Sequence, residues 1–104
     1  MLLMKKAFFE GIRTGAKTTT FRYWRWCHVR PGSVQTVPGL GKVHIDAAEA
    51  IQPEDMTDDD ARSDGFSDLD TLRRALEELY PPEKRNGRKL FRIAFTLLPT
   101  PSSP

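Results

Sequence analysis

The spacing of hydrophobic positions along this chain predicts three helices. Within residues 5–14, apolar side chains recur at helical intervals, and Gly15 follows as a stop signal. A second, short helix is expected after Thr57, a residue type that caps helix N-termini. The third covers residues 67–80, and two prolines end it. Its apolar face is formed by Leu69, Leu72, Leu76 and Leu79.

Four other segments have the composition or the alternation of strands. They cover residues 17–26, 33–37, 42–51 and 90–98. Val43, Ile45 and Ala47 alternate with polar neighbours, which is the period of a half-buried strand. The strands follow one another too closely for repeated helical crossovers, so a doubly wound parallel sheet is disfavoured. We therefore expect an α+β fold, a small mixed or antiparallel β-barrel with flanking helices.

Length and composition set the frame for these elements. The chain has 104 residues, 38% of them hydrophobic, which suits one domain with one real core. We expect that domain over residues 4–98 and a flexible tail over residues 99–104, which are rich in proline and serine. No apolar run approaches the roughly 20 residues of a membrane span. The N-terminus is a poor signal peptide, because its lysines follow its apolar residues. We expect a soluble, cytoplasmic protein with no membrane partner.

Charge is distributed unevenly along the chain. Residues 1–44 carry eight Lys or Arg and one acid, residues 45–80 carry twelve acids and three Arg, and residues 81–104 carry five Lys or Arg and one acid. If the two basic ends meet in the fold, the molecule has a positive face suited to phosphate-bearing ligands. The alternative is a scatter of solvated charges.

The segment from Gly15 to Arg22 is the most unusual in the chain. A glycine ends a helix, and Lys17 follows as a strand begins. A bulge there could bring Lys17 beside Thr20, and a neutral lysine can take a proton from a hydroxyl nucleophile. That chemistry requires the pKa of Lys17 to fall by about 3 units, which burial and a nearby cation such as Arg22 could supply. The alternative is a lysine that protects an exposed strand edge.

Aromatic and basic residues interleave over residues 23–30. Aromatic rings stack on bases while guanidinium groups hold phosphates, so this stretch is a candidate nucleobase or nucleic-acid surface. The substrate-binding candidates are Arg22, Tyr23, Trp24 and Arg25. The alternative is a structural role for the rings, and we expect one tryptophan in the core and the other exposed.

The remaining candidate groups are weaker. Cys27 is the single cysteine, so no internal disulfide can form, and its neighbour His28 would point to the other side of a strand. We expect no metal site and no cofactor. Three aspartates at positions 58–60 suit the first turn of a helix. Asp64 lies beside Gly65 where the chain turns, so it is either a simple turn residue or a carboxylate that points into a groove.

The pattern from Gly15 to Arg22, with the order of elements and the Leu79-Tyr80-Pro81 helix end, resembles the ASCH domain family of the PUA-like superfamily. Within that family the chain is most similar to small bacterial N4-acetylcytidine amidohydrolases. The resemblance implies that Lys17 is the activating base, Thr20 the nucleophile and Asp64 the acidic group. Asp64 is one methylene shorter than the glutamate of those enzymes.

The same resemblance leaves other functions open. Other ASCH relatives are proposed RNA binders, and one is described as a nuclease. The alternatives to a hydrolase are therefore a non-catalytic domain that binds RNA or a nucleotide and an RNA-processing nuclease. We expect a nucleoside or RNA ligand, and nothing in the sequence indicates a protein partner.

Overall fold

One antiparallel sheet of four strands forms the centre of the molecule. The computed structural model describes residues 1–99, so the predicted tail lies outside the described residues except for Pro99. The sheet has the spatial order β1-β4-β3-β2, and each neighbouring pair runs antiparallel. The strands are β1 (Thr19–Trp24), β2 (Val34–Val37), β3 (Gly41–Ile51) and β4 (Lys89–Leu97).

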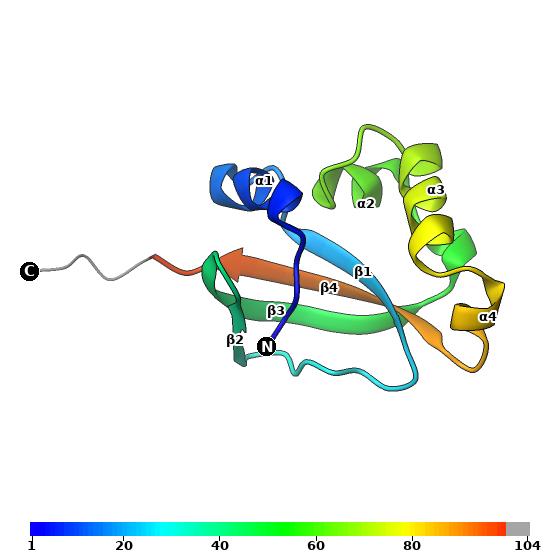
Figure 1. Ribbon diagram of the computed structural model, residues 1–104, viewed down its shortest axis with the longest axis horizontal. Coiled ribbons are helices and arrows are strands. Elements are labelled where there is room, and N and C mark those ends of the chain that lie inside the picture. The colour runs from blue at the N-terminus through cyan, green and yellow to red at the C-terminus, as the bar shows by residue number, and fades with distance from the viewer. Residues whose placement is uncertain (100–104) are drawn as a thin grey trace, which may run out of the picture.

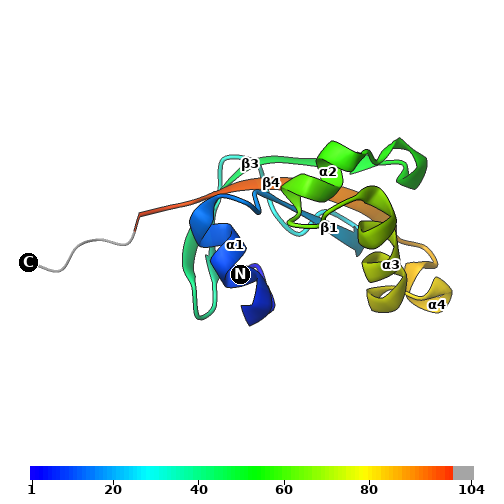
Figure 2. The same cartoon turned by 90° about the horizontal axis from the view of Figure 1, so that it is seen from above.

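The helices gather along the β1 side of the sheet (Figure 1). Figure 2 shows α1 and α3 apart from each other, with β1 running between them and α2 near the strands. The helical elements are η1 (Lys6–Phe8), α1 (Phe9–Thr14), η2 (Pro53–Asp55), α2 (Asp58–Ser63), α3 (Leu69–Leu79) and α4 (Pro82–Arg85). The predicted α+β class is therefore confirmed.

The sheet is open and does not close into the predicted barrel. Within residues 1–99, β1 pairs only with β4 and β2 pairs only with β3, so both remain edge strands. Residues 25–33 connect these two edges as a loop and add no fifth strand between them. Barrel closure requires the outer strands to meet in a continuous ladder, which this loop does not provide.

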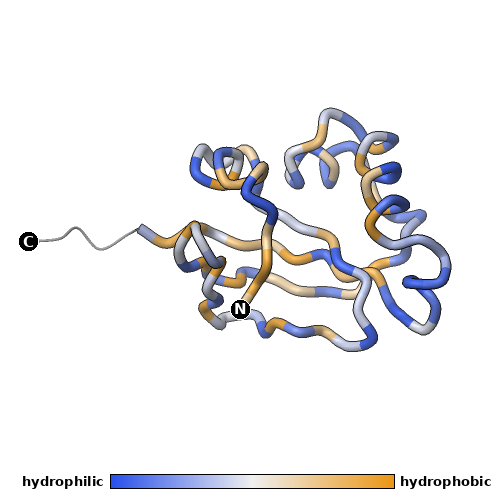
Figure 3. The backbone as a smooth tube through the Cα atoms, in the orientation of Figure 1, coloured by the Kyte–Doolittle hydropathy of each residue, from blue (hydrophilic) through white to orange (hydrophobic). Residues whose placement is uncertain are grey.

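The two faces of the sheet carry separate hydrophobic clusters. Phe21 and Tyr23 point to the face covered by α2 and α3, where Leu72 and Leu76 are buried against them. The other face carries Ile93 and its neighbours, with Leu2, Phe9 and Ile12 packed over them. Orange, apolar stretches accordingly follow the strands in Figure 3, while blue, polar residues dominate the loops around α2 and α4. Strand β1 thus lies between two layers of side chains.

The predicted elements agree with the structure apart from their ends. The first helix begins with the 3-10 turn η1, and the strand expected over residues 17–26 is trimmed to β1. Thr57 caps α2 through a reciprocal capping box with Asp60, and Asp68 caps α3. The short helix α4 was not among the predicted elements, because the two prolines mark an end of α3 and equally suit the start of a new helix. Across the described residues no helix combines the length and the apolar character that a membrane crossing needs.

The alternation predicted for β3 is correct up to Ile45 and wrong for Ala47. A register shift between Ile45 and Ala47 interrupts the pairing with β4. A bulge of this kind adds a residue and reverses which side chains point inward. Ala47 is consequently exposed, and Ala48 packs against the cluster instead.

The pairing of β1 with β4 brings the basic N-terminal and C-terminal parts of the chain side by side. Arg22 lies opposite Phe91, and Trp24 lies opposite Lys89. The acidic middle segment supplies α2 and α3. These helices pack over the face of β1 that carries Phe21 and Tyr23, which is opposite the face that carries Arg22.

The packing of α3 gives a test of which face holds it to the sheet. Leu72 is 1% exposed, whereas Leu79 on the same helix is 45% exposed. We expect Leu72→Ala to lower the free energy of unfolding by about 2–5 kcal/mol, because it leaves a cavity in the core. Leu79→Ala should cost less than about 1 kcal/mol. Urea denaturation followed by circular dichroism measures both, and equal losses would contradict this packing.

Candidate active site at the free edge of strand β1

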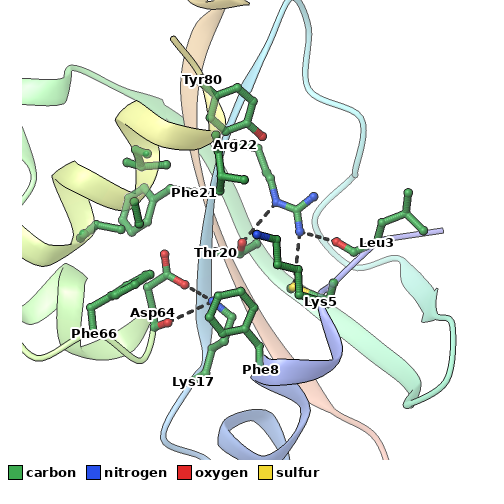
Figure 4. Close-up of a pocket in the computed structure, with 15 residues that line it drawn as sticks. Leu3, Lys5, Phe8, Lys17, Thr20, Phe21, Arg22, Asp64, Phe66 and Tyr80 are labelled. Atoms are coloured by element: carbon green, nitrogen blue, oxygen red, sulfur yellow. Dashed lines mark hydrogen bonds and ion pairs between the residues drawn. The ribbon is translucent and has the colours of Figure 1, made fainter.

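A pocket of about 170 Å³ lies along the free edge of β1. Three consecutive strand residues, Thr20, Phe21 and Arg22, line it, which places it at the edge of the sheet and not on one face. The N-terminal segment forms one wall and α3 forms the other (Figure 4). The other lining residues are Leu3, Met4, Lys5, Phe8, Lys17, Asp64, Phe66, Leu72, Ala75, Leu76, Leu79 and Tyr80.

Lys17 and Asp64 form a buried ion pair at one end of this pocket. Both residues are almost inaccessible, at 3% and 5% exposure. The Lys17 Nζ donates to the carboxylate Oδ1 of Asp64, and also to the Asp64 main-chain oxygen and to the Thr19 main-chain oxygen, each at 3.1 Å. These three oxygen acceptors hold the amine in one position.

Two glycines make the turns that bring this pair together. Gly15 ends α1 with a φ of 83°, and Gly65 follows Asp64 with a φ of 89°. Both values lie in the left-handed region, where a side chain is strained. The Lys17 N–H then donates to Gly11 O of α1, and the Thr18 N–H donates to Ser63 O of α2. Main-chain hydrogen bonds thus connect the segment that leads into β1 to both α1 and α2.

The two sequence interpretations of Asp64 are thereby separated. It is the C-terminal cap of α2, but its carboxylate points inward and lines the pocket. Lys17 is likewise buried, so it does not protect an exposed strand edge.

The electrostatic environment changes the acidity of the buried amine. Burial, and after it the nearby Arg22 guanidinium, lower the pKa of Lys17 to about 7. The Asp64 carboxylate acts in the opposite sense, because a neighbouring negative charge favours the ammonium. An amine that titrates near neutral pH can accept and return a proton, which an ordinary lysine cannot do there.

Thr20 receives a hydrogen bond from Arg22 and is 5% exposed. The Arg22 Nε donates to Thr20 Oγ1 at 3.2 Å, so the hydroxyl keeps its own proton free for another partner. One terminal nitrogen of Arg22 donates to Leu3 O at 2.5 Å and to Met4 Sδ at 3.3 Å. Burial lowers the pKa of Arg22, and the interaction with Tyr80 opposes that shift.

Aromatic rings close the ends of the pocket. Phe8 and Phe66 meet edge to face with ring centroids 6.3 Å apart, and the Lys17 Nζ lies 4.7 Å from the centroid of Phe8. At the other end, Tyr80 stands beside Arg22 (Figure 4). Phe8 and Phe66 were not predicted as site residues. Their only signal was apolar character, which does not distinguish a pocket wall from a core.

The other predicted binding residues lie outside the lining of this pocket. Tyr23 is buried against Tyr80, with ring centroids 5.3 Å apart. Trp24 stacks on His28 at 4.5 Å, and Arg25 is exposed. Their role in ligand binding stays a prediction. Trp26 is 67% exposed while Trp24 is half-buried, close to the division expected for the two tryptophans.

Potential metal ligands do not cluster in the described part of the chain. Among residues 1–99, no three His, Cys, Asp or Glu side chains gather closely enough to hold a metal ion. Cys27 donates to Val29 O at 3.1 Å and His44 pairs with Asp46, so these groups have local partners. The polar groups that line the pocket include the amine of Lys17, the hydroxyl of Thr20 and the carboxylate of Asp64.

Comparisons with known proteins show the fold of the chain. No protein-family model and no curated protein matches the sequence. Among solved structures, the ASCH domain from Lactobacillus crispatus matches with a TM-score of 0.74 at 17% identity, covering 88% of this chain and 70% of that one. The hypothetical protein PH0355 matches with a TM-score of 0.77 at 14% identity, covering 92% and 95%. Protein EF3133 from Enterococcus faecalis matches at 0.63 and 15%, covering 88% and 70%.

The burial of Lys17 predicts an unusual pH dependence. In the unfolded chain this lysine has its ordinary pKa of 10.5, and in the folded chain its pKa is about 7. Between these values the unfolded state binds more protons, so the free energy of unfolding rises with pH, by up to about 1.4 kcal/mol per unit. Below the folded pKa this contribution is flat. Urea denaturation at several pH values measures it.

The control is Lys17→Met, which keeps the length of the side chain and removes its charge. We expect this variant to lose the rise in stability that the wild type gains from Lys17. A nuclear magnetic resonance titration of the lysine side chains gives the pKa directly. A midpoint for Lys17 among those of the exposed lysines would refute the perturbed amine.

Proposed function

We propose that this chain, which has the fold of an ASCH domain, is an amidohydrolase that removes acyl groups from N4-acylated cytidine-type nucleosides. One observation carries the proposal: Lys17, Thr20 and Asp64 line a single pocket although Lys17 and Asp64 are 47 positions apart. These are the three residues that the resemblance to N4-acetylcytidine amidohydrolases selects. We assign the activity to the cytoplasm.

In the proposed reaction Thr20 is the nucleophile and Lys17 is the general base. Neutral Lys17 takes the hydroxyl proton as Thr20 Oγ1 adds to the acyl carbon, and it then gives that proton to the departing amine. Water cleaves the resulting ester and restores the hydroxyl. The pKa of Lys17, about 7, suits both directions of transfer.

Asp64 acts in this scheme by positioning the amine. Its carboxylate and main-chain oxygens both accept from Lys17, so the side chain cannot swing away from the pocket. The carboxylate also stabilises the ammonium that forms when Lys17 takes the proton. The shorter aspartate reaches Lys17 because the main chain of the same residue lies against the amine.

The size and lining of the pocket favour a small planar group. A volume of about 170 Å³ is below the roughly 300–1,000 Å³ of pockets that take drug-sized ligands. Its walls are largely apolar and include Phe8 and Phe66, while Thr20 and Arg22 supply polar groups from β1. A single base with its acyl group fits this description better than a folded polymer. The sugar and any phosphate attached to that base would remain outside the pocket.

A second candidate function is binding of single-stranded RNA without turnover. His28 stacks on Trp24 with their planes 8° apart, and the exposed ring of Trp26 lies 5.6 Å from His28. Exposed stacked rings beside Arg25 suit bases and phosphates. This reading predicts affinity for RNA that falls steeply with salt and no release of product.

Hydrolysis of N4-acetylcytidine tests the first candidate. We expect the wild type to release cytidine, and Thr20→Val to lose at least about a hundred-fold in kcat because it lacks the nucleophile. Thr18→Val is the matched control, since Thr18 is an exposed threonine two positions earlier. It should retain full activity. Lys17→Met should be as inactive as Thr20→Val, because the two groups act as one unit and the loss of either one disables the other.

Chromatography of substrate and product measures these rates, with circular dichroism to verify folding. If the wild type releases no cytidine from several N4-acylcytidines, the amidohydrolase proposal is wrong. Binding of RNA by that inactive protein, lost in Trp26→Ala, would then support the second candidate.

A further inference from the structure

The main chain of β1 offers a group that the side-chain chemistry does not include. We propose that the Phe21 N–H is the hydrogen-bond donor that stabilises the negative oxygen formed when Thr20 attacks the acyl carbonyl. This inference rests on the amidohydrolase function proposed above and adds a catalytic residue to it.

The register of β1 fixes the direction of each main-chain group. Phe95 N–H donates to Thr18 O at 2.9 Å, so Thr18 is a hydrogen-bonded partner of β4. Such partners alternate along an antiparallel pair, which makes Thr20 and Arg22 the next residues bonded to β4. The main-chain groups of Thr19, Phe21 and Tyr23 therefore point away from β4, toward the free edge. The bond from Lys17 Nζ to Thr19 O, at 3.1 Å, agrees with this alternation.

The Phe21 N–H meets no protein acceptor at that edge. The N–H points away from Arg92, the partner of Phe21 on β4. Among residues 1–99 neither a main-chain nor a side-chain oxygen accepts a hydrogen bond from it. Phe21 nevertheless lines the pocket together with Thr20. An unpaired N–H at the wall of a pocket is a donor awaiting a ligand oxygen.

The proposed donor and base lie on either side of the nucleophile. Along the edge, the Thr19 C=O precedes Thr20 and holds the Lys17 amine, and the Phe21 N–H follows Thr20. An acyl carbon attached at Thr20 Oγ1 thus has the amine toward one side and the N–H toward the other. The N–H of the residue after the nucleophile serves as an oxyanion donor in other acyl-transfer folds.

Arg22 is the side-chain alternative for this role. Its Nε is committed to Thr20 Oγ1, and one terminal nitrogen is committed to Leu3 O and Met4 Sδ. These bonds fix the hydroxyl and the N-terminal wall. A main-chain donor costs no such bond and needs no movement, which suits stabilisation of charge that develops during reaction.

The step balances without a further reactant. The Thr20 Oγ1–carbon bond forms, the carbonyl π electrons move to oxygen, and the hydroxyl proton goes to Lys17. The oxyanion accepts from the Phe21 N–H. When the carbonyl re-forms, the carbon–N4 bond breaks and N4 takes the proton from Lys17.

Replacement of one amide by an ester tests the donor without changing a side chain. Phe21→phenyllactic acid substitutes an oxygen for the N–H and keeps the ring. We expect kcat for N4-acetylcytidine to fall about a hundred- to a thousand-fold, with KM little changed, because the bond forms in the transition state. The matched control is Val34→2-hydroxyisovaleric acid. Val34 is an exposed residue of β2, the edge strand at the opposite side of the sheet, and does not line this pocket, so its ester should retain nearly full activity.

The outcomes separate this inference from the function on which it rests. If the wild type is active and the two esters lose activity equally, the Phe21 donor is refuted while the amidohydrolase stands. If the wild type is inactive on all N4-acylcytidines, the function itself fails and the donor with it. Thermal unfolding of both esters verifies that they fold.

A second measurement avoids the ester altogether. Methylboronic acid adds to hydroxyl nucleophiles as a tetrahedral anion, and its adduct on Thr20 would present an oxygen to the edge. In wild-type protein we expect the Phe21 amide proton to move downfield on addition while that of Tyr23 stays in place. An adduct that leaves the Phe21 resonance unmoved would overturn the assignment.

Discussion

The buried contact between Lys17 and Asp64 is the constraint on which the site depends. It joins the start of β1 to the end of α2, and the adjoining main-chain bonds reach Gly11 of α1 and Ser63 of α2. Two charged groups removed from water gain little net stability from each other, and a hydrophobic pair of similar size often serves a fold better. The pair is therefore better explained by what it positions than by what it stabilises. It holds an amine of altered acidity beside a strand edge.

The open edge of the sheet places other polar groups in the same pocket as that amine. Because β1 has no partner on its outer side within the described residues, side chains from both faces and main-chain groups from the edge reach one pocket. A residue in the middle of a sheet can present only its side chain. The combination of Lys17 with Thr20 and the Phe21 main chain is available only at such an edge.

Much of the fold could be predicted from the sequence, because apolar spacing and capping residues are local signals. The leucines of α3 and the Thr57 cap illustrate this. The bulge in β3 could not be predicted, since one extra residue leaves the apolar pattern almost unchanged while it reverses the inward side. The open edge was also missed, because whether β1 meets β2 is decided by the path of residues 25–33 and not by the composition of either strand.

The candidate site was predictable only in part. Lys17 and Thr20 are close in sequence, so their proximity follows from local structure. Asp64 was selected as the acidic group through a resemblance. Its two interpretations could not be separated from the sequence, because whether its carboxylate points into a pocket depends on how α2 packs against the start of β1. Phe8, Phe66 and Tyr80 give no sequence signal as pocket walls, because an apolar ring looks the same in a core. Packing between distant segments decides that difference.

The unpaired edge of β1 has a further consequence for the behaviour of the protein at high concentration. Strands with free N–H and C=O groups recruit strands from other molecules, and many proteins shield them with charges or bulges. Here the N-terminal segment and α3 stand on either side of the edge, and the space between them is a small pocket. The walls of the pocket therefore stand where a strand from another copy of this chain would have to pair with β1.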